Sequence, residues 1–156
     1  MIEIPERLIQ EIHLHGERTY PEECCGVMLG VQQDRLQIVH TILPIGNSQE
    51  LNRQRRFLIT PEQYRNAEKN AIDIGFDLLG FYHSHPDHPA MPSAFDTEHA
   101  LPWFTYVIVS IINGKARTTS AWVLSEDRRV FDERPLHISR LLKRKPPRYR
   151  ERQNEK

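Results

Sequence analysis

The sequence predicts one mixed α/β domain over residues 1–138, followed by a basic tail over residues 139–156. Helical patterns alternate with short apolar runs along the chain, and no internal repeat is visible. A chain of 156 residues is long enough for one hydrophobic core, and 38% hydrophobic with 27% charged residues is typical of a globular domain. We therefore expect a single mixed sheet with flanking helices.

The N-terminal segment predicts a helix and then a hairpin. In a helix over residues 5–15, Leu8 and Ile12 share one face, and Gly16 is placed to end the helix. Two apolar runs follow, separated by four polar residues, which is typical of a strand hairpin. The expected strands cover residues 24–31 and 36–43.

The second helix has the clearest boundaries. A polar loop over residues 46–56 leads to a short predicted strand over residues 57–59. Thr60 can then cap a helix, and Gln63 is placed to complete a capping box with it. Apolar residues recur at steps of three and four until Gly75, which we expect to stop the helix.

The C-terminal half contains more strands. A buried strand over residues 78–82 runs directly into a histidine-rich segment, and Ser93 can start another short helix. A last helix is expected over residues 137–145. Between these two helices we expect three strands, over residues 104–112, 118–124 and 130–131.

The charged residues are unevenly distributed. The chain has 21 basic and 21 acidic residues, and a net charge of zero argues against a nucleic-acid-binding protein that is basic throughout. Residues 139–156, however, hold eight basic and two acidic residues, so residues 1–138 carry a net charge of −6. Two interpretations of this tail stay open: a solubilising end, or a contact for an acidic partner or nucleic acid.

Membrane insertion and secretion are disfavoured. No apolar stretch approaches the roughly 18 residues of a spanning helix, and the N-terminus lacks the basic and apolar regions of a signal peptide. Cys24 and Cys25 are adjacent, which is poor geometry for an ordinary disulfide. They also lie in an apolar run, where cysteine commonly acts as a small hydrophobic residue. We therefore expect a cytoplasmic protein without a thiol nucleophile.

His83 and His85 form the most informative pattern in the sequence. Residues two apart at the end of a strand project to the same side, and two imidazoles held in this way make a good pair of zinc ligands. Asp96, in the following predicted helix, can supply a third ligand and leave a fourth position for water. An open position is typical of a catalytic zinc site, where the bound water ionises near neutral pH.

A metal-dependent hydrolase also needs a proton acceptor that is not a ligand. Glu22 and Glu23 stand at the start of the first hairpin strand. A carboxylate there can reach the site if that strand lies beside the strand of His83. Ser93 can orient the scissile carbonyl or stabilise its developing oxyanion, although its position also suits a helix cap.

The run from His83 to Asp96 resembles the JAMM motif of the MPN+ metalloproteases, His-x-His-Pro-x6-Ser-x-x-Asp. The family also carries an upstream glutamate three residues before a glycine, and Glu23 stands in this relation to Gly26. The similarity in element order covers residues 4–134. The resemblance implies a cytidine-deaminase-like α/β fold, zinc-dependent hydrolysis of a peptide or isopeptide bond, and one zinc ion per chain.

The resemblance also implies roles for individual residues. It assigns His83, His85 and Asp96 to zinc. It assigns general acid/base catalysis to Glu23 and stabilisation of the tetrahedral intermediate to Ser93. Because only ten residues separate the second histidine from the aspartate, the chain resembles the compact prokaryotic members. Some of these cleave peptides or amino acids from the C-terminus of ubiquitin-like sulfur-carrier proteins, which implies such a tail as the substrate.

Other functions fit the residues less well or stay open. A zinc nucleobase deaminase needs His-x-Glu with Pro-Cys-x-x-Cys, and a thermolysin-like protease needs His-Glu-x-x-His; neither pattern occurs. A non-catalytic MPN scaffold and a cell-wall or phage-tail-type peptidase with the same motif stay open. A set of two histidines and one carboxylate can also hold iron. Among the other histidines, His88 can line the cleft, and His99 lies near Asp96 but is expected at the surface.

Overall fold

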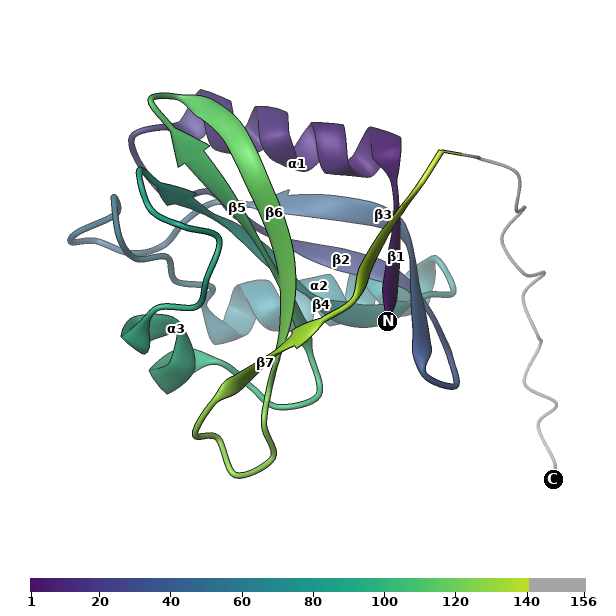
Figure 1. Cartoon of the computed structure of the whole chain (residues 1–156). Coiled ribbons are helices and arrows are strands. Elements are labelled where there is room, and N and C mark those ends of the chain that lie inside the picture. Colours follow the sequence, from purple (N-terminus) through teal and green to yellow (C-terminus); the bar gives the residue numbers. More distant parts are fainter. Residues whose placement is uncertain (141–156) are drawn as a thin grey trace, which may run out of the picture.

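The computed structural model describes residues 1–140, which form one eight-stranded mixed sheet and three helices (Figure 1). The strands are β1 Ile2–Pro5, β2 Cys25–Gln33, β3 Leu36–Ile45, β4 Asp77–Pro86, β5 Thr105–Ile112, β6 Lys115–Leu124, β7 Phe131–Arg134 and β8 Leu136–Ser139. The helices are α1 Glu6–Thr19, α2 Pro61–Asp73 and α3 Ala94–His99. The strand order across the sheet is β7-β6-β5-β4-β2-β3-β1-β8, which confirms the predicted mixed α/β class.

The sheet curls until its two edges approach each other. β7 and β8 are separated only by Pro135, yet they lie at opposite ends of the strand order. The backbone N–H of Ile2 on β1 donates to the carbonyl of Pro135 at 3.0 Å. On the β7 side, Arg134 donates to the side-chain oxygen of Gln37 on β3 at 3.1 Å. One continuous segment therefore borders both edges of the sheet.

Helices α1 and α2 cover opposite faces of the sheet (Figure 1). Leu8 and Ile12 of α1 pack in one apolar cluster with Tyr82 of β4. Ala67 of α2 packs in a second cluster with Phe81 of β4. Because successive side chains of a strand point to opposite faces, β4 contributes to both cores.

Strand β4 lies in the centre of the sheet, where it can position a buried site. It pairs antiparallel with β2 and parallel with β5. His83 lies opposite Cys25 on β2 and opposite Ile108 on β5. The strand that follows Glu23 therefore lies beside the strand of His83, as the expected approach of the glutamate requires.

The structure confirms the predicted start of α2 but not the predicted end of α1. The capping box of α2 is confirmed: Thr60 Oγ1 accepts from the N–H of Gln63 at 3.2 Å, and Gln63 Oε1 accepts from the N–H of Thr60 at 2.8 Å. The predicted stop at Gly16 is wrong, because α1 continues to Thr19. A Cβ atom at Gly16 would lie 2.9 Å from Ile111 Cδ1, so this glycine permits close packing of α1 on β5.

Two other predicted elements need correction. Residues 57–59 form no strand, because the N–H of Leu58 donates to the side-chain oxygen of Asn47 at 3.0 Å instead of to a neighbouring strand. The helix predicted over residues 137–145 is also wrong at its start. Residues 136–139 pair with β1 as a parallel strand.

The strand β1 was missed, and it supplies the pairing partner of β8. The rest of that predicted helix and the tail beyond residue 140 lie outside the described residues. Within residues 1–140, no helix is long and apolar enough to cross a membrane.

Candidate metal centre

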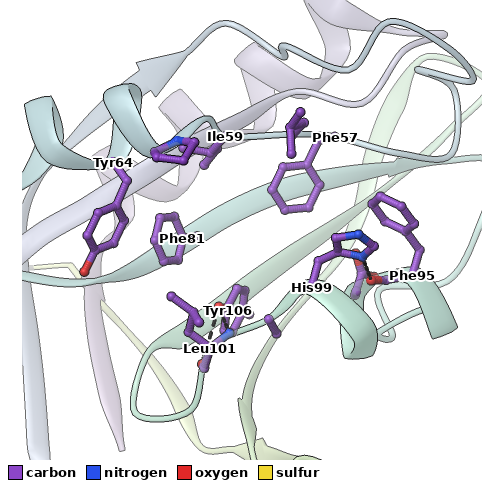
Figure 2. Close-up of a pocket in the computed structure, with 12 residues that line it drawn as sticks. Phe57, Ile59, Tyr64, Phe81, Phe95, His99, Leu101 and Tyr106 are labelled. Atoms are coloured by element: carbon purple, nitrogen blue, oxygen red, sulfur yellow. Dashed lines mark hydrogen bonds between the residues drawn. The ribbon is translucent and has the colours of Figure 1, made fainter.

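Two cavities border the segment that contains the metal-binding motif. The first, which we call the apolar cavity, has a volume of about 270 Å³ and includes Asp96 in its wall (Figure 2). Its apolar wall includes Phe57, Tyr64, Phe81, Leu101 and Tyr106. The second, which we call the Glu23 cavity, has a volume of about 260 Å³ and includes Glu23, His85 and Ser93 in its wall. The motif therefore borders both cavities.

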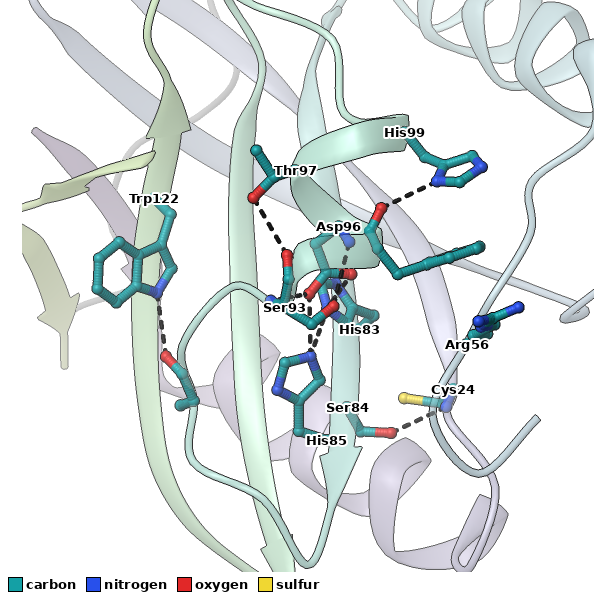
Figure 3. Close-up of polar contacts among 12 residues, drawn as sticks. Cys24, Arg56, His83, Ser84, His85, Ser93, Asp96, Thr97, His99 and Trp122 are labelled. Atoms are coloured by element: carbon teal, nitrogen blue, oxygen red, sulfur yellow. Dashed lines mark hydrogen bonds and ion pairs between the residues drawn. The ribbon is translucent and has the colours of Figure 1, made fainter. Parts of the chain in front are cut away.

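The three predicted ligands converge on one point (Figure 3). His83 Nε2 lies 3.1 Å from His85 Nε2 and 3.4 Å from Asp96 Oδ1. His85 Nε2 lies 3.2 Å from Asp96 Oδ2. All three side chains are buried, with exposed fractions of 0% for His83, 5% for His85 and 8% for Asp96. Strand β4 and helix α3 thus bring together residues that are up to 13 positions apart in the sequence.

The geometry of this cluster fits a small metal ion. A tetrahedral zinc with bonds of about 2.0–2.1 Å separates its ligand atoms by about 3.3 Å, close to the spacing found here. His85 Nδ1 lies 2.9 Å from the carbonyl oxygen of Pro89, which can only accept, so Nδ1 carries a hydrogen and donates it. In a neutral His85, Nε2 is then an acceptor that faces the carboxylate of Asp96. Two buried acceptors in contact require a cation or a proton between them.

The loop that orients His85 is held by side chains from other strands. Ser110 on β5 donates to the carbonyl of His88 at 2.5 Å. Trp122 Nε1 on β6 donates to the carbonyl of Ala90 at 3.0 Å (Figure 3). These bonds flank Pro89, whose carbonyl accepts from His85. Partners of this kind fix the ring orientation and the tautomer of a histidine ligand.

Asp96 is positioned by the capping box of α3. Ser93 Oγ accepts from the N–H of Asp96 at 3.1 Å, and the N–H of Ser93 donates to Asp96 Oδ2 at 2.7 Å. Burial opposes ionisation of this carboxyl, but His83 and His85 hold the pKa of Asp96 well below its usual range. Ser93 is thus a helix cap, and its hydroxyl hydrogen is still available to a substrate. Its predicted catalytic role stays a prediction.

Glu23 lies two residues before the start of β2, and its side chain is only 3% exposed. Among residues 1–140, its Oε2 atom has no hydrogen-bond partner. Burial raises the pKa of the Glu23 carboxyl to about 8, with His85 opposing this rise and Asp96 adding to it. Its neighbour Glu22 is half-exposed and lies 3.9 Å from Arg53. A cation held by the neighbouring histidines and aspartate would lower this pKa, so the unpartnered carboxyl group of Glu23 is a strong candidate for the proton acceptor.

Sequence reasoning missed two residues that shape the site. Phe57 stacks on the ring of His83, with the ring centroids 4.5 Å apart. Asn47 connects the loop before α2 to the catalytic candidate: its Nδ2 donates to the carbonyl of Glu23 at 3.2 Å and to that of Arg56 at 3.0 Å. Neither residue carries a local signal, because each acts through a partner that is distant in the sequence.

The two cysteines are buried, His88 borders a cavity and His99 is exposed, as the sequence suggested. Burial raises the pKa of the Cys24 thiol to about 11 and that of the Cys25 thiol to about 12, so neither supplies a thiolate at neutral pH. His88 lines the Glu23 cavity. His99 is exposed, stacks on Phe95, and lies 2.9 Å through Nδ1 from the Phe95 carbonyl.

The sheet topology and the spacing of the ligand cluster define an MPN-type domain with a candidate metal centre at the end of its central strand. The chain belongs to the prokaryotic homologs of the JAB domain, whose family model matches residues 5–125. This match confirms the predicted resemblance to the compact prokaryotic members.

Three curated relatives are similar to the chain. A desampylase from Haloferax volcanii is 35% identical over 91 residues, which cover 58% of this chain and 63% of the relative. Tail tip assembly protein K from Escherichia phage N15 is 34% identical over 117 residues, covering 72% of this chain and 42% of the relative. A probable TtuB-protein conjugate cleaving protease from Thermus thermophilus is 31% identical over 105 residues, covering 67% of each. The matches thus span less than two thirds of the first two relatives.

Two solved structures share the fold. A protein from Desulfitobacterium hafniense superposes with a TM-score of 0.80 at 26% identity, covering 92% of this chain and 96% of the neighbour. A JAB1/MPN domain protein from Archaeoglobus fulgidus superposes with a TM-score of 0.56 at 16% identity, covering 88% of this chain and 97% of the neighbour. The second likeness supports the fold alone.

Proposed function

We propose that the protein is a zinc-dependent hydrolase that cleaves a peptide or isopeptide bond at the C-terminus of a ubiquitin-like or sulfur-carrier protein. One observation carries this proposal: the unpartnered, buried carboxylate of Glu23 shares a cavity with His85, whose acceptor nitrogen already faces Asp96. A purely structural metal site has no use for such a carboxylate, whereas hydrolysis needs a base beside the ligands.

Each residue of the site has a separate role in the proposed reaction. His83, His85 and Asp96 hold one zinc ion, which when bound lowers the pKa of water and polarises the scissile carbonyl. Glu23 accepts a proton from the attacking water and delivers it to the leaving amine. The Ser93 hydroxyl donates to the developing oxyanion while its oxygen still caps α3. Water adds to the scissile carbonyl first and gives the tetrahedral oxyanion. The C–N bond then breaks, so water supplies the OH of the new carboxyl group and the hydrogen of the released amine.

The enclosure of the site favours a thin, flexible substrate segment. The ligand cluster is almost fully buried, so a chain that ends in small residues reaches it more easily than a folded surface does. The apolar cavity beside Asp96 has room for one apolar side chain from the upstream part of that tail. The names of the Haloferax and Thermus relatives support a protein conjugate as the substrate.

A peptidase of the phage-tail type is the second candidate. The similarity to tail tip assembly protein K favours it. The third candidate, a non-catalytic MPN scaffold, would keep the fold without turnover. We also propose a cytoplasmic setting, because Cys24 and Cys25 are free and buried, and a domain over residues 1–138 with a separate basic tail.

One experiment distinguishes these functions. The zinc-loaded protein is incubated with sulfur-carrier proteins bearing short C-terminal extensions, with ubiquitin-like conjugates and with cell-wall peptides, and the products are identified by mass spectrometry. We expect cleavage directly after a terminal Gly-Gly. Cleavage of cell-wall peptides alone would favour the second candidate, and no cleavage of any substrate would favour the scaffold.

Glu23→Gln tests the assigned base. The variant should retain about one zinc per chain by elemental analysis and lose turnover by about 100-fold or more, because the amide cannot accept the proton. The matched control is Glu22→Gln, which removes the neighbouring half-exposed carboxylate and should leave the rate nearly unchanged. An unaffected rate in Glu23→Gln would assign the base to another residue.

A further inference from the structure

The loop between β3 and α2 carries three arginines, and only one of them enters the Glu23 cavity without a partner. Arg53 lies 3.9 Å from Glu22 and also donates to a loop carbonyl. The guanidinium of Arg56 lies 4.8 Å from the centre of the Phe95 ring. Arg55 lines the Glu23 cavity, and its side chain has no hydrogen bond or ion pair to any residue in the range 1–140.

The backbone around Arg55 is fixed on both sides. The N–H of Glu23 donates to the carbonyl of Arg53 at 2.8 Å, and Asn47 Nδ2 donates to the carbonyl of Arg56 at 3.0 Å. The N–H of Arg55 itself donates to the carbonyl of Asn52 at 3.0 Å. The backbone that carries Arg55 is therefore held beside Glu23, and the donors of the exposed Arg55 side chain stay available to a ligand in the cavity that both residues line.

The chemistry of the leaving group suggests what those donors bind. In our proposed function, Glu23 delivers a proton to the amine that leaves. When this amine belongs to an amino acid released from a C-terminus, a free carboxylate lies only two bonds from the nitrogen. Arginine binds carboxylates through two parallel hydrogen bonds. A lysine released from an isopeptide bond carries no such group near its amine.

The size of the cavity agrees with a single released residue. Its volume is about 260 Å³, which accommodates one amino acid of ordinary size, and Met91 and Pro89 provide an apolar part of the wall. We propose that Arg55 binds the free α-carboxylate of a single C-terminal amino acid, so that the preferred substrate is a main-chain peptide bond at the end of a carrier protein. The inference rests on the proposed function and narrows it.

Binding can be measured without turnover. Zinc-loaded Glu23→Gln is titrated calorimetrically with an acetylated peptide ending in Gly-Gly-Leu, once as the free acid and once as the C-terminal amide. We expect the acid to bind about tenfold more tightly, and adding Arg55→Gln should abolish this preference. The matched control adds Arg53→Gln, which removes an equal charge from the same loop and should keep the preference.

Equal affinity for acid and amide, or a preference that survives Arg55→Gln, would overturn the role of Arg55. Failure to bind either form would contradict the proposed function and with it this inference.

Turnover by the wild-type protein distinguishes the proposed hydrolase function from the proposed selection of a free carboxylate by Arg55. A carrier protein ending in Gly-Gly-Leu is compared with its C-terminal amide and with a Gly-Gly isopeptide on a lysine side chain. The free acid should have a kcat/KM about tenfold higher, mainly through KM, and Arg55→Gln should reduce this ratio to about one. Equal cleavage of all three substrates would retain the proposed function but reject the selection by Arg55.

Discussion

Strand β4 and the loop over residues 46–60 both form walls of the candidate site, but they are held in opposite ways. β4 is paired along both edges, and His83 at its end is completely buried. The loop has no strand pairing and is held by isolated backbone bonds and a few side-chain bonds, four of them made by Asn47. The paired strand holds its histidines in a fixed geometry, whereas the loop is a surface segment that can change without disturbing the core.

This difference separates the chemistry from the selection of substrates. The proposed ligands come from a paired strand and a capped helix, which resist displacement, as a preorganised metal site requires. Arg55 and Phe57 come from the loop, where substitutions are tolerated more easily. We therefore expect changes in β4 to affect metal binding first and changes in the loop to affect substrate binding first.

The largest effect is expected from removing a ligand on the strand. His85→Ala should lose zinc and reduce turnover by more than about 1,000-fold, because a two-ligand site holds the ion weakly. Elemental analysis of the purified variant measures the first loss, and a single-substrate rate measures the second. His137→Ala, an exposed histidine on β8, is the control. Full zinc content in His85→Ala would place the metal elsewhere.

A smaller effect is expected from removing a hydrogen bond that holds the loop which orients His85. Trp122→Phe keeps most of the ring packing but removes the N–H that donates to Ala90, beside the carbonyl that orients His85. Zinc affinity should fall about tenfold, as measured by competition with a chromogenic chelator. Trp103→Phe is the matched control, because Trp103 is 77% exposed. Equal losses in both variants would contradict the proposed orienting role.

Local patterns allowed prediction of the ligand set but not of its supports. The His-x-His pair and the Ser93 cap depend on residues close in the sequence, so strand and helix geometry suffice to bring them together. Trp122 and Ala90 are 32 positions apart, and no periodic pattern connects them. The helix predicted over residues 137–145 was wrong at its start for the same reason. Its first residues pair with β1, at the other end of the described chain.

The loop itself is tested through Asn47. Asn47→Ala removes four hydrogen bonds that connect Glu23, Arg56, Gln49 and Leu58. We expect kcat/KM to fall about tenfold and the free energy of unfolding to fall by about 1–3 kcal/mol, with zinc affinity unchanged. Asn66→Ala, on the exposed side of α2, is the control for loss of an amide. A loss of zinc in Asn47→Ala would show that the loop and the strand are not independent.

The last expected effect is on the stability of the metal-free protein. The pKa of Glu23 rises from an ordinary value of 4.5 to about 8 in the fold. Below about pH 4.5 the carboxyl is protonated in both states, so it has no effect on stability. As the pH rises from there to about 8, the unfolded state loses the proton more readily, and the free energy of unfolding decreases. Glu23→Gln removes this penalty, which is on the order of 5 kcal/mol above pH 8.

The chelated variant should therefore be more stable than the chelated wild type at pH 8.5 and nearly equal to it at pH 5. Denaturant unfolding at both pH values measures the difference, with Glu22→Gln as the control for a neighbouring carboxylate. A difference that is the same at pH 5 and pH 8.5 would mean that the substitution acts through packing and not through the buried charge. A pH-dependent difference would show that the fold retains Glu23 despite its destabilising effect, which is expected of a residue kept for chemistry.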